Sequence, residues 1–499
     1  MNMKNYYLTT TLPYVNADPH IGFALEIVQA DVLARYHTLL GEKVIFNTGT
    51  DEHGLKIYRK AEENKQDPQA YCDEYAAKFD ALKKSLNLSY TNFIRTTDPH
   101  HIKAAQEFWL RCLANGDIYK KNYQVKYCVG CELEKTDSEL VDDKCPVHPN
   151  LEIELINEEN YFFKFSKYQK PLLDLYEKNK DFVVPANRLL EIKNFVTKGL
   201  EDFSISRLKT KMPWGVEVPN DKDHVMYVWF DALINYISTL GWPEDEKNFE
   251  AFWPGYQVAG KDNLRQQSAM WQAMLLSAKL PTSKQVFIHG FITSDGQKMS
   301  KSAGNVVEPY TLIEKYGTDA VRYFLLGALP SYDDGDFTIK RFEDFYTAHL
   351  VNGIGNCTSR IITMLEKYCD DNPWINKNNK KNVFGDNKFL FRECLEKYDF
   401  YGAVNTIDGM VSYLDGAISS SKPWEKAKAG EDISDLLYLL AEGLYQVALA
   451  LLPIIPDTAK KILTQLGQEI PTEYGNLTEW GTLKPDTKIN KGEILFPRL

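Results

Sequence analysis

The sequence predicts an α/β fold: a doubly wound parallel sheet interrupted by an insertion and followed by an α-helical bundle. Strand and helix patterns alternate through the N-terminal half, break between about residues 117 and 223, and give way to helical periodicity from about Phe342 to Leu466. Strand–helix alternation is typical of a parallel sheet with crossover helices. At 499 residues, the chain is too long for one core and should hold about two to four domains.

The first elements follow from simple patterns. Residues Tyr6–Thr11 are rich in strand-forming side chains, and the apolar positions of Ile21–Leu40 recur at helical spacing until Gly41. A short buried strand at Val44–Thr48 and a helix at about Leu55–Asn64 come next. This order predicts neighbouring parallel strands joined by helices.

The insertion has shorter and more irregular elements, including the aromatic strand Tyr161–Phe165 and the turn Met212–Gly215. Strand patterns then return at Val225–Phe230, Gln257–Ala259 and Val286–Ile288, with a helix predicted over about Gln266–Ala278. We therefore expect five segments: the first half of the sheet domain (1–116), the insertion (117–223), the second half of the sheet domain (224–293), a linking segment (294–341) and the helical domain (342–499).

Composition excludes some classes of protein. The formal net charge of −11 argues against a general nucleic-acid coat, so a nucleic acid would have to meet local basic patches. No apolar run approaches the ~20 residues of a membrane span, and the N-terminus lacks the apolar core of a signal peptide. We expect a cytoplasmic protein.

Five cysteines are predicted to be free, mostly buried thiols: Cys72, Cys112, Cys357, Cys369 and Cys394.

The remaining three cysteines form a metal-binding pattern with a histidine. Cys128-x-x-Cys131 is followed, after thirteen residues, by Cys145-x-x-His148. This is the two-plus-two spacing of a tetrahedral knuckle. Three thiolates and one imidazole favour Zn²⁺ in a closed, structural site.

Two motifs suit phosphate binding. His20 and Gly22 lie where a strand gives way to a helix, whose N-terminus offers free N–H groups and a positive dipole end. By itself this histidine fits a capping or packing role better. Lys298 and Lys301 lie some 280 residues later in a Gly- and Ser-rich loop, where two ammonium groups could clamp a triphosphate. The pairing of the two motifs favours the phosphate-binding interpretation of both.

One helical face could meet bases. Asn352, Asn356 and Arg360 are spaced by four residues, so they share one side of an α-helix. Planar amides and a guanidinium can pair with or stack on unpaired bases. A solvated helix face is the simpler alternative.

The two phosphate motifs are similar to the signature pair of class I aminoacyl-tRNA synthetases, and the surrounding sequence resembles the methionyl family. The resemblance runs from about Tyr6 to Leu466 and includes the stretches Leu12–Asn16, Gly49–Gly54, Tyr227–Ala232, Gly260–Asp262 and His289–Ile292. It implies a Rossmann-type catalytic domain, ATP-dependent activation of L-methionine, and transfer to tRNA(Met), including the initiator tRNA. The family's zinc knuckle stands in the insertion, where Cys128, Cys131, Cys145 and His148 lie.

The resemblance also implies residue roles. His20, Lys298 and Lys301 would be catalytic, stabilising the phosphates of ATP together with Mg²⁺. The ATP site would comprise His20, Gly22, Gly260, Asp262, Phe291, Ile292, Lys298 and Lys301. Asp51 would hold the ammonium group of the amino acid, and the rest of its pocket would be Leu12, Tyr14, Trp229, Ala232, Leu233, Tyr236, Asn263 and Gln267. Asn352, Asn356, Arg360 and Trp424 would meet the anticodon. No dimerisation module is evident, so we expect a monomer.

Three positions depart from the family pattern. Phe23 replaces the final histidine of the His-Ile-Gly-His motif, Asn263 replaces an isoleucine, and Gln267 replaces a histidine that faces the substrate's sulfur. Two alternatives therefore stay open. One is a class I synthetase of another specificity, although the leucine, isoleucine and valine enzymes carry an editing insertion that has no room here, and the cysteine enzyme has a catalytic zinc. The other is a paralogue that binds tRNA without forming an adenylate.

Overall fold

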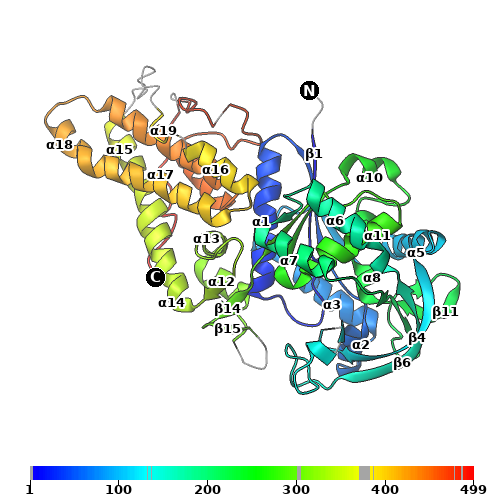
Figure 1. Ribbon diagram of the computed structural model, residues 1–499. Helices are drawn as coiled ribbons and strands as arrows, with labels where there is room; N and C mark the ends of the chain where they lie inside the picture. The colour runs from blue at the N-terminus through cyan, green and yellow to red at the C-terminus, as the bar shows by residue number, and fades with distance from the viewer. Residues whose placement is uncertain are drawn as a thin grey trace.

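The computed structural model describes residues 4–131, 133–135, 137–299, 305–369, 382–385, 387–476, 478–484 and 487–499. Figure 1 shows two lobes, one built around a β-sheet and one made of helices that include α15, α17 and α19, with the long helix α1 (Ile21–Leu39) between them. The predicted α/β fold with a helical C-terminal part is thus confirmed.

The main sheet has six parallel strands in the order β3-β2-β1-β12-β13-β7. Their bounds are β1 Asn5–Thr10, β2 Lys43–Thr50, β3 Asn92–Arg95, β7 Val183–Val184, β12 Tyr256–Gly260 and β13 Gln285–His289. The helices between β2 and the insertion are α2 Leu55–Glu63, α3 Pro68–Asp80, α4 Leu82–Ser85 and α5 Pro99–Ala114. Strand β7 reaches this sheet from within residues 117–223.

Both faces of the sheet are buried, as in a doubly wound fold. Tyr6 and Leu8 of β1 pack with α1, whereas Tyr7 packs with α5 and with α11 (Trp271–Ser277) on the other face. In β13, Phe287 lies in the first cluster and Val286 in the second. This alternation follows from the two-residue period of a strand. Apolar side chains on both faces explain why these strands are continuous hydrophobic runs.

The insertion forms two smaller sheets. The first has the order β5-β4-β6-β8 and the second β10-β11-β9. Their bounds are β4 Ile118–Cys128, β5 Leu133–Lys135, β6 Glu154–Phe163, β8 Phe203–Ser204, β9 Ser206–Leu208, β10 Glu217–Val218 and β11 Asp221–Met226, with helices α6 Gln169–Lys178 and α7 Ala186–Thr197 and the 3₁₀ turns Asp137–Glu139 and Phe165–Tyr168. The predicted strand Tyr161–Phe165 is the end of β6 and the turn that follows it.

The predicted strand Val225–Phe230 is partly wrong. Strand β11 ends at Met226, and helix α8 (Val228–Ala232) begins two residues later. A short apolar run has no periodicity that separates a buried strand from a buried helix. The helix predicted at Gln266–Ala278 is present, but its first turn, η4 (Gln266–Met270), is π-helical and α11 follows.

The rest of the chain is largely helical. The elements after α8 include α9 Asn235–Ser238, α10 Glu246–Phe252 and the 3₁₀ turn η3 Lys261–Asn263. A small sheet of order β15-β14-β16 then links the lobes; its strands are β14 Ile292–Ser294, β15 Gln297–Lys298 and β16 Gly335–Phe337. The helices that follow are α12 Pro309–Tyr316, α13 Thr318–Gly327, α14 Ile339–Phe345, the π-helix η6 Tyr346–Gly355, α15 Asn356–Tyr368, α16 Asn387–Glu396, α17 Phe400–Ser421, α18 Pro423–Lys428, α19 Ser434–Leu451 and α20 Pro456–Gln465.

Helix α19 is long and apolar enough, by length and composition, to cross a membrane, and it alone meets this test within the described ranges. The expectation that no apolar run comes near that length therefore does not hold for α19. However, 72% of this stretch is buried inside the fold, which is typical of a core helix.

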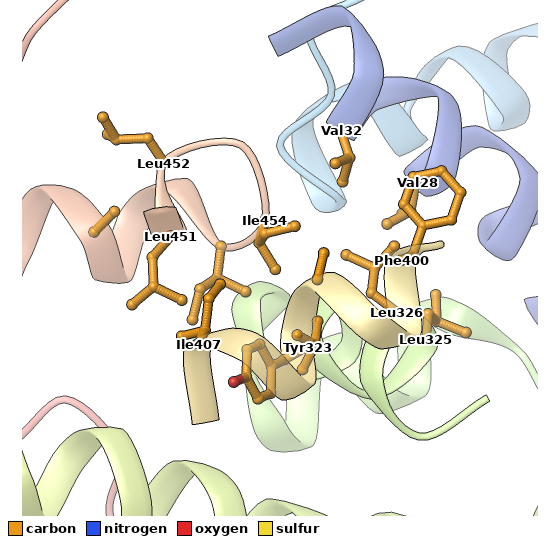
Figure 2. Packing of buried hydrophobic residues seen from close by; sticks show 14 of the residues in the cluster. Val28, Val32, Tyr323, Leu325, Leu326, Phe400, Ile407, Leu451, Leu452 and Ile454 are labelled. Carbon is orange, nitrogen blue, oxygen red and sulfur yellow. The ribbon is translucent and has the colours of Figure 1, made fainter. Parts of the chain in front are cut away.

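The two lobes share one apolar core and a buried arginine. In Figure 2, Val28 and Val32 of α1 lie beside side chains from α13, α17 and the segment that follows α19, among them Leu326, Phe400 and Ile454. Arg322 of α13 lies in this junction with no exposed side-chain surface, 2.8 Å from the Asp31 carboxylate. Its Nε donates to the Ile454 carbonyl (2.9 Å) and its Nη1 to the Leu86 carbonyl (3.0 Å). One side chain therefore links α1, the sheet lobe and the segment before α20.

Replacing Arg322 with alanine is expected to lower the free energy of unfolding by about 3–5 kcal/mol, because a buried Asp31 carboxylate would lose one of its two cations. Burial alone raises the pKa of Asp31, but the charges of Arg322 and Arg35 outweigh it and lower that pKa. Urea unfolding measures the loss. Lys340→Ala is the control, because its ion pair with Asp344 is 85% and 69% exposed and should contribute little. An Arg322→Ala loss no larger than that of the control would contradict the prediction.

Candidate active site at the carboxyl edge of the main sheet

The predicted site residues converge where the parallel strands end. The chain leaves β1 toward β2 on one side, while β12 pairs with β1 on the other side. Such a switch point opens a crevice beyond the carboxyl ends of the strands, where α/β proteins bind ligands. The segments that leave β1, β2, β12 and β13 carry some of the predicted site residues, and helices α8 and α9 carry others.

His20 caps helix α1. Its Nδ1 accepts a hydrogen bond from the Gly22 backbone N–H at 3.1 Å, so the neutral ring carries its proton on Nε2. A Cβ atom on Gly22 would lie 2.9 Å from His20 Cε1, so a side chain there would displace the ring. The capping role that we considered is therefore confirmed. The cap also fixes which ring nitrogen is a donor.

The lysine loop is described only at its ends. Lys301 lies outside the described residues, and of Lys298 only the backbone, at the end of β15, is described. Beyond the loop, the Val307 carbonyl accepts a hydrogen bond from the Ile21 backbone N–H at 3.0 Å. The segment that follows the loop is thereby attached to the first turn of α1, next to His20.

Phe23 has a packing role at the position where the family has histidine. Its ring meets Phe79 of α3 edge to face, with centroids 5.3 Å apart. It is partly buried against the core cluster that includes α1. An apolar contact thus replaces the second ring N–H that the family motif would supply.

Asp51 follows β2 and is 3% exposed. Its backbone N–H donates to the Pro13 carbonyl at 3.0 Å, and its carbonyl accepts from the Val15 N–H at 3.3 Å. These bonds hold the segment after β1 beside the segment after β2. Tyr14 from the first of these segments meets Trp229 of α8 at a ring-centroid distance of 6.4 Å, so aromatic walls and a carboxylate come from neighbouring segments.

Short helices supply the remaining wall of the predicted amino-acid pocket. Ala232, Leu233 and Tyr236 are all buried, and Leu12 is partly buried. Gln267 of η4 donates from Nε2 to the Tyr236 hydroxyl at 2.6 Å. Burial raises the pKa of Tyr236, and the nearby carboxylates of Glu26 and Asp51 raise it further.

Asp262 and Asn263 come shortly after Gly260, the last residue of β12, in the part of the site predicted to bind the nucleotide. A Cβ atom on Gly260 would lie 2.8 Å from the Asp262 carboxylate, and Asn263 donates to that carboxylate at 3.2 Å. Asn263 is thus engaged with its neighbour in the chain. The Phe291 backbone is also paired: its N–H donates to Asp334 at 2.9 Å and its carbonyl accepts from the Gly335 N–H at 2.9 Å. Ile292 begins β14 directly after it.

Sequence reasoning missed a buried ion pair beside the site. His289 Nε2 lies 3.0 Å from Glu26 Oε2, and Thr11 donates to the other Glu26 oxygen from its backbone N–H at 2.8 Å. Burial lowers the pKa of His289, but the hydrogen bond and charge of Glu26 outweigh this effect and raise it. The pair joins the segments that leave β1 and β13. Its sequence signal is a glutamate in the middle of an apolar helical run.

A second missed group lies under α8. Asp231 is fully buried and meets His53 Nδ1 at 2.6 Å and His101 Nε2 at 2.9 Å. Burial raises the pKa of Asp231, but the charge of His53 and the hydrogen bonds from both histidines outweigh it and lower it to about 2. These contacts fix α8, and hence Trp229, relative to the segment after β2.

The four predicted metal ligands are brought together. One ligand atom each from Cys128, Cys131, Cys145 and His148 lie within 4.8 Å of one another. Cys131 Sγ lies 3.5 Å from Cys145 Sγ and 3.2 Å from His148 Nδ1. Around a tetrahedral zinc with Zn–S bonds of about 2.3 Å, sulfur atoms lie about 3.8 Å apart, so the donors fit such an ion. Gly130 is required here, because its Cβ would lie 2.6 Å from the His148 ring.

This knuckle touches the predicted amino-acid pocket. Tyr127 and Val129 flank the first cysteine, and they share a small apolar cluster with Tyr14, Tyr227, Val228 and Trp229. The Arg207 guanidinium lies over the rings of Tyr127 (5.2 Å) and Tyr227 (4.5 Å). The metal-binding segment therefore supports one wall of the pocket.

The predicted anticodon residues lie on the helical lobe. Asn352 and Asn356 are exposed, and Arg360 pairs with Asp415 of α17. We expected Asn352, Asn356 and Arg360 to lie on one regular α-helix. This expectation is wrong for Asn352, because it lies within the π-helix Tyr346–Gly355, before α15 begins. Trp424 of α18, just beyond α17, is 44% exposed, which is unusual for so large an apolar ring.

The sheet topology and the placement of the predicted site residues define the class of the protein: a doubly wound α/β protein whose candidate site lies at the carboxyl edge of the sheet, beside the N-terminus of α1. Comparison with known proteins gives the family. The chain belongs to the tRNA synthetases class I (M), whose family model matches residues 6–154 and 134–362.

Relatives cover the whole chain. The methionine--tRNA ligase of Thermosynechococcus vestitus is 40% identical over 99% of this chain and 98% of the relative, and that of Thermotoga maritima is 38% identical over 99% of this chain and 80% of the relative. Among solved structures, Mycobacterium tuberculosis methionyl-tRNA synthetase in complex with methionyl-adenylate superimposes with a TM-score of 0.92 at 36% identity. That match covers 99% of this chain and 100% of the other.

Proposed function

We propose that this protein joins L-methionine to tRNA(Met) using ATP. The methionine carboxylate attacks the α-phosphorus of ATP to give methionyl-adenylate and diphosphate. A terminal ribose hydroxyl of the tRNA then takes the methionyl group and releases AMP. The single observation that carries this proposal is the pairing of Tyr14 with the buried Asp51 at the switch point of the sheet, with the Trp229 ring 6.4 Å from that of Tyr14.

Asp51 would bind the ammonium group of methionine, because a buried carboxylate is stabilised by a cation. The α-amino group would then point toward β2, leaving the substrate carboxylate free to face the nucleotide. Leu12, Tyr14, Trp229, Ala232 and Leu233 would surround the side chain with apolar surface. A thioether suits such walls, since sulfur–aromatic contacts contribute ~0.3–1.5 kcal/mol.

His20 would donate from Nε2 to a phosphate oxygen, since its Nδ1 accepts the Gly22 N–H. Lys298 and Lys301 would stabilise the leaving diphosphate, with Gly260, Asp262, Phe291 and Ile292 around the nucleoside. Bound Mg²⁺ supplies charge neutralisation on the phosphates. Orientation and electrostatic stabilisation account for such a reaction without a protein nucleophile.

Zn²⁺ is the metal that the Cys₃His cluster fits best, in a structural role. For the tRNA, Asn352, Asn356, Arg360 and Trp424 would meet the anticodon, because exposed amides and an exposed aromatic ring can pair with and stack on unpaired bases. We also propose the five-segment domain division given above, a monomer and a cytoplasmic location.

The test is ATP–diphosphate exchange with each of the twenty amino acids in the presence of Mg²⁺. We expect exchange with methionine alone. Exchange with another amino acid would overturn methionine as the proposed substrate. It would still support amino-acid activation by ATP as the class of reaction.

Phe23 supports one competing function, a tRNA-binding paralogue without adenylate synthesis, because its ring packs on Phe79 instead of offering a donor. Folded, zinc-containing protein that binds tRNA(Met) but gives no exchange with any amino acid would favour that function.

A further inference from the structure

His53 and Asp231 form a buried, hydrogen-bonded dyad beside the predicted amino-acid site. His53 Nδ1 lies 2.6 Å from one Asp231 oxygen, and the other oxygen lies 2.9 Å from His101 Nε2. Burial raises the pKa of Asp231, but the charge of His53 and the hydrogen bonds from both histidines lower it to about 2. The carboxylate is therefore ionised and can only accept hydrogen bonds. It follows that His53 carries a proton on Nδ1.

His53 lies on the same face of its segment as Asp51. The contact of Glu52 shows the alternation of side chains, because its carboxylate accepts from the Thr50 hydroxyl two residues earlier, at 2.7 Å. Side chains of extended chain alternate with a period of two residues, so Asp51 and His53 lie on the opposite face. The backbone of Asp51 also pairs with Tyr14. His53 thus shares the face that carries the predicted ammonium-binding carboxylate.

The second ring nitrogen of His53 is uncommitted. Within the described ranges, His53 Nε2 makes no hydrogen bond, and it is not sealed from solvent. Trp214 of the insertion packs edge-on against the ring at a centroid distance of 5.5 Å, and its Nε1 donates to the Glu52 carbonyl at 2.5 Å. The ring is thus held by a carboxylate and an indole, and Nε2 is left open.

The second step of the proposed reaction needs a proton acceptor. The ribose hydroxyl of the tRNA must lose its proton as its oxygen attacks the methionyl carbonyl carbon. His20 Nδ1 is occupied by the Gly22 N–H, and Asp51 is proposed to bind the ammonium group. A neutral His53 has a lone pair on Nε2, while Asp231 orients the ring through Nδ1 and would stabilise the imidazolium that forms.

We propose that His53 is the general base of the transfer step and that Asp231 is its positioning residue. This inference rests on the proposed function. The hydroxyl proton passes to His53 Nε2 while the ribose oxygen forms a bond to the methionyl carbonyl carbon. The bond between that carbon and the phosphate oxygen then breaks, and AMP leaves with the electron pair. His53 finally releases the proton to water.

The decisive variant is His53→Asn, whose amide nitrogen can take the place of Nδ1 and still donate to Asp231. Single-turnover transfer from preformed enzyme-bound methionyl-adenylate to saturating tRNA(Met), followed by rapid quench, measures the second step. ATP–diphosphate exchange on the same preparation measures the first step. We expect transfer to slow about 100-fold or more and exchange to change about threefold at most, because general bases contribute about 10²–10⁴-fold. Transfer that keeps more than about a tenth of its rate, or that falls no further than exchange, would overturn the proposal.

Asp231→Asn tests the positioning role. Its amide oxygen can still accept from His53, but it carries no charge to stabilise the imidazolium, so transfer should slow about tenfold or more while exchange changes far less. His101→Gln is the matched control, because His101 binds the other Asp231 oxygen and a glutamine amide can donate in its place. This control should keep the ratio of transfer to exchange. An equal fall of that ratio in both variants would overturn the role of Asp231.

The pH dependence of transfer gives a test that needs no variant. Only a neutral imidazole accepts a proton, and imidazole ordinarily changes its charge between about pH 5 and 8. The titratable groups around the ring are Asp231, which stays ionised in this range, His101 behind it and Asp51 on the same segment. We expect the transfer rate to fall as the pH drops from about 8 to about 5.5, and His53→Asn to lose this dependence. A flat profile in the unmodified protein would overturn the proposal, whereas no exchange with methionine at any pH would instead overturn the proposed function.

Discussion

Asp51→Ala is expected to lower kcat/KM for methionine in ATP–diphosphate exchange about 100- to 1,000-fold. Removing one partner of a buried, hydrogen-bonded charge pair costs about 2–5 kcal/mol, and 1.4 kcal/mol corresponds to a factor of ten. Asp51 is 3% exposed, so water would not replace the lost carboxylate effectively. The KM for ATP should change far less, because Asp51 is proposed to contact only the amino acid.

Two variants control this experiment. Asp51→Asn keeps the shape of the side chain and should lose most of the same activity, which would attribute the effect to charge. Glu63→Ala removes an exposed carboxylate of α2, whose ion pair with Lys60 lies on the surface, and should leave kcat/KM within about twofold. Asp51→Ala activity within tenfold of the unmodified protein would contradict the ammonium-binding role.

Cys145→Ala is expected to abolish stoichiometric zinc binding and to unfold the knuckle between Cys128 and His148. Structural zinc sites of this type bind with about 10–16 kcal/mol, and that free energy is also folding free energy. With Tyr127 and Val129 no longer held against Trp229 and Tyr14, the KM for methionine should rise. Elemental analysis of the purified protein measures the metal, and exchange kinetics measure the consequence.

The matched control for the metal experiment is Cys369→Ala. Cys369 is a free, partly buried thiol outside the cluster, so its removal should leave the zinc content near one per chain. Full zinc retention in Cys145→Ala, or unmodified protein prepared without chelator that carries no zinc, would show that the four residues do not form a zinc site.

Much of the fold followed from local patterns. The strand–helix order around β1, α1 and β2 predicted the parallel sheet, because period-2 and period-3.6 patterns are properties of the chain itself. The ligand set of the knuckle was predictable for the same reason: two short turns place four donors by sequence spacing alone. The capping of α1 by His20 involves residues two positions apart and was also foreseeable.

The short apolar run at Val225–Phe230 was not decidable from the sequence. Its side chains are hydrophobic on every face, so no periodicity distinguishes strand from helix. The contacts of Asp231 with His53 and His101 form only when three distant segments meet, and they hold α8 in place. Tertiary contacts thus select the helix.

The sequence by itself determined the α/β class, the family and the set of three cysteines and one histidine that could hold a metal ion. Only the tertiary structure decided that Glu26 pairs with His289, that Arg322 joins the two lobes, and that Asp231 pairs with His53 and His101. These features are contacts between side chains that lie far apart in the chain. Their energies come from burial, which makes each unpaired polar group costly and so leaves one arrangement of donors and acceptors.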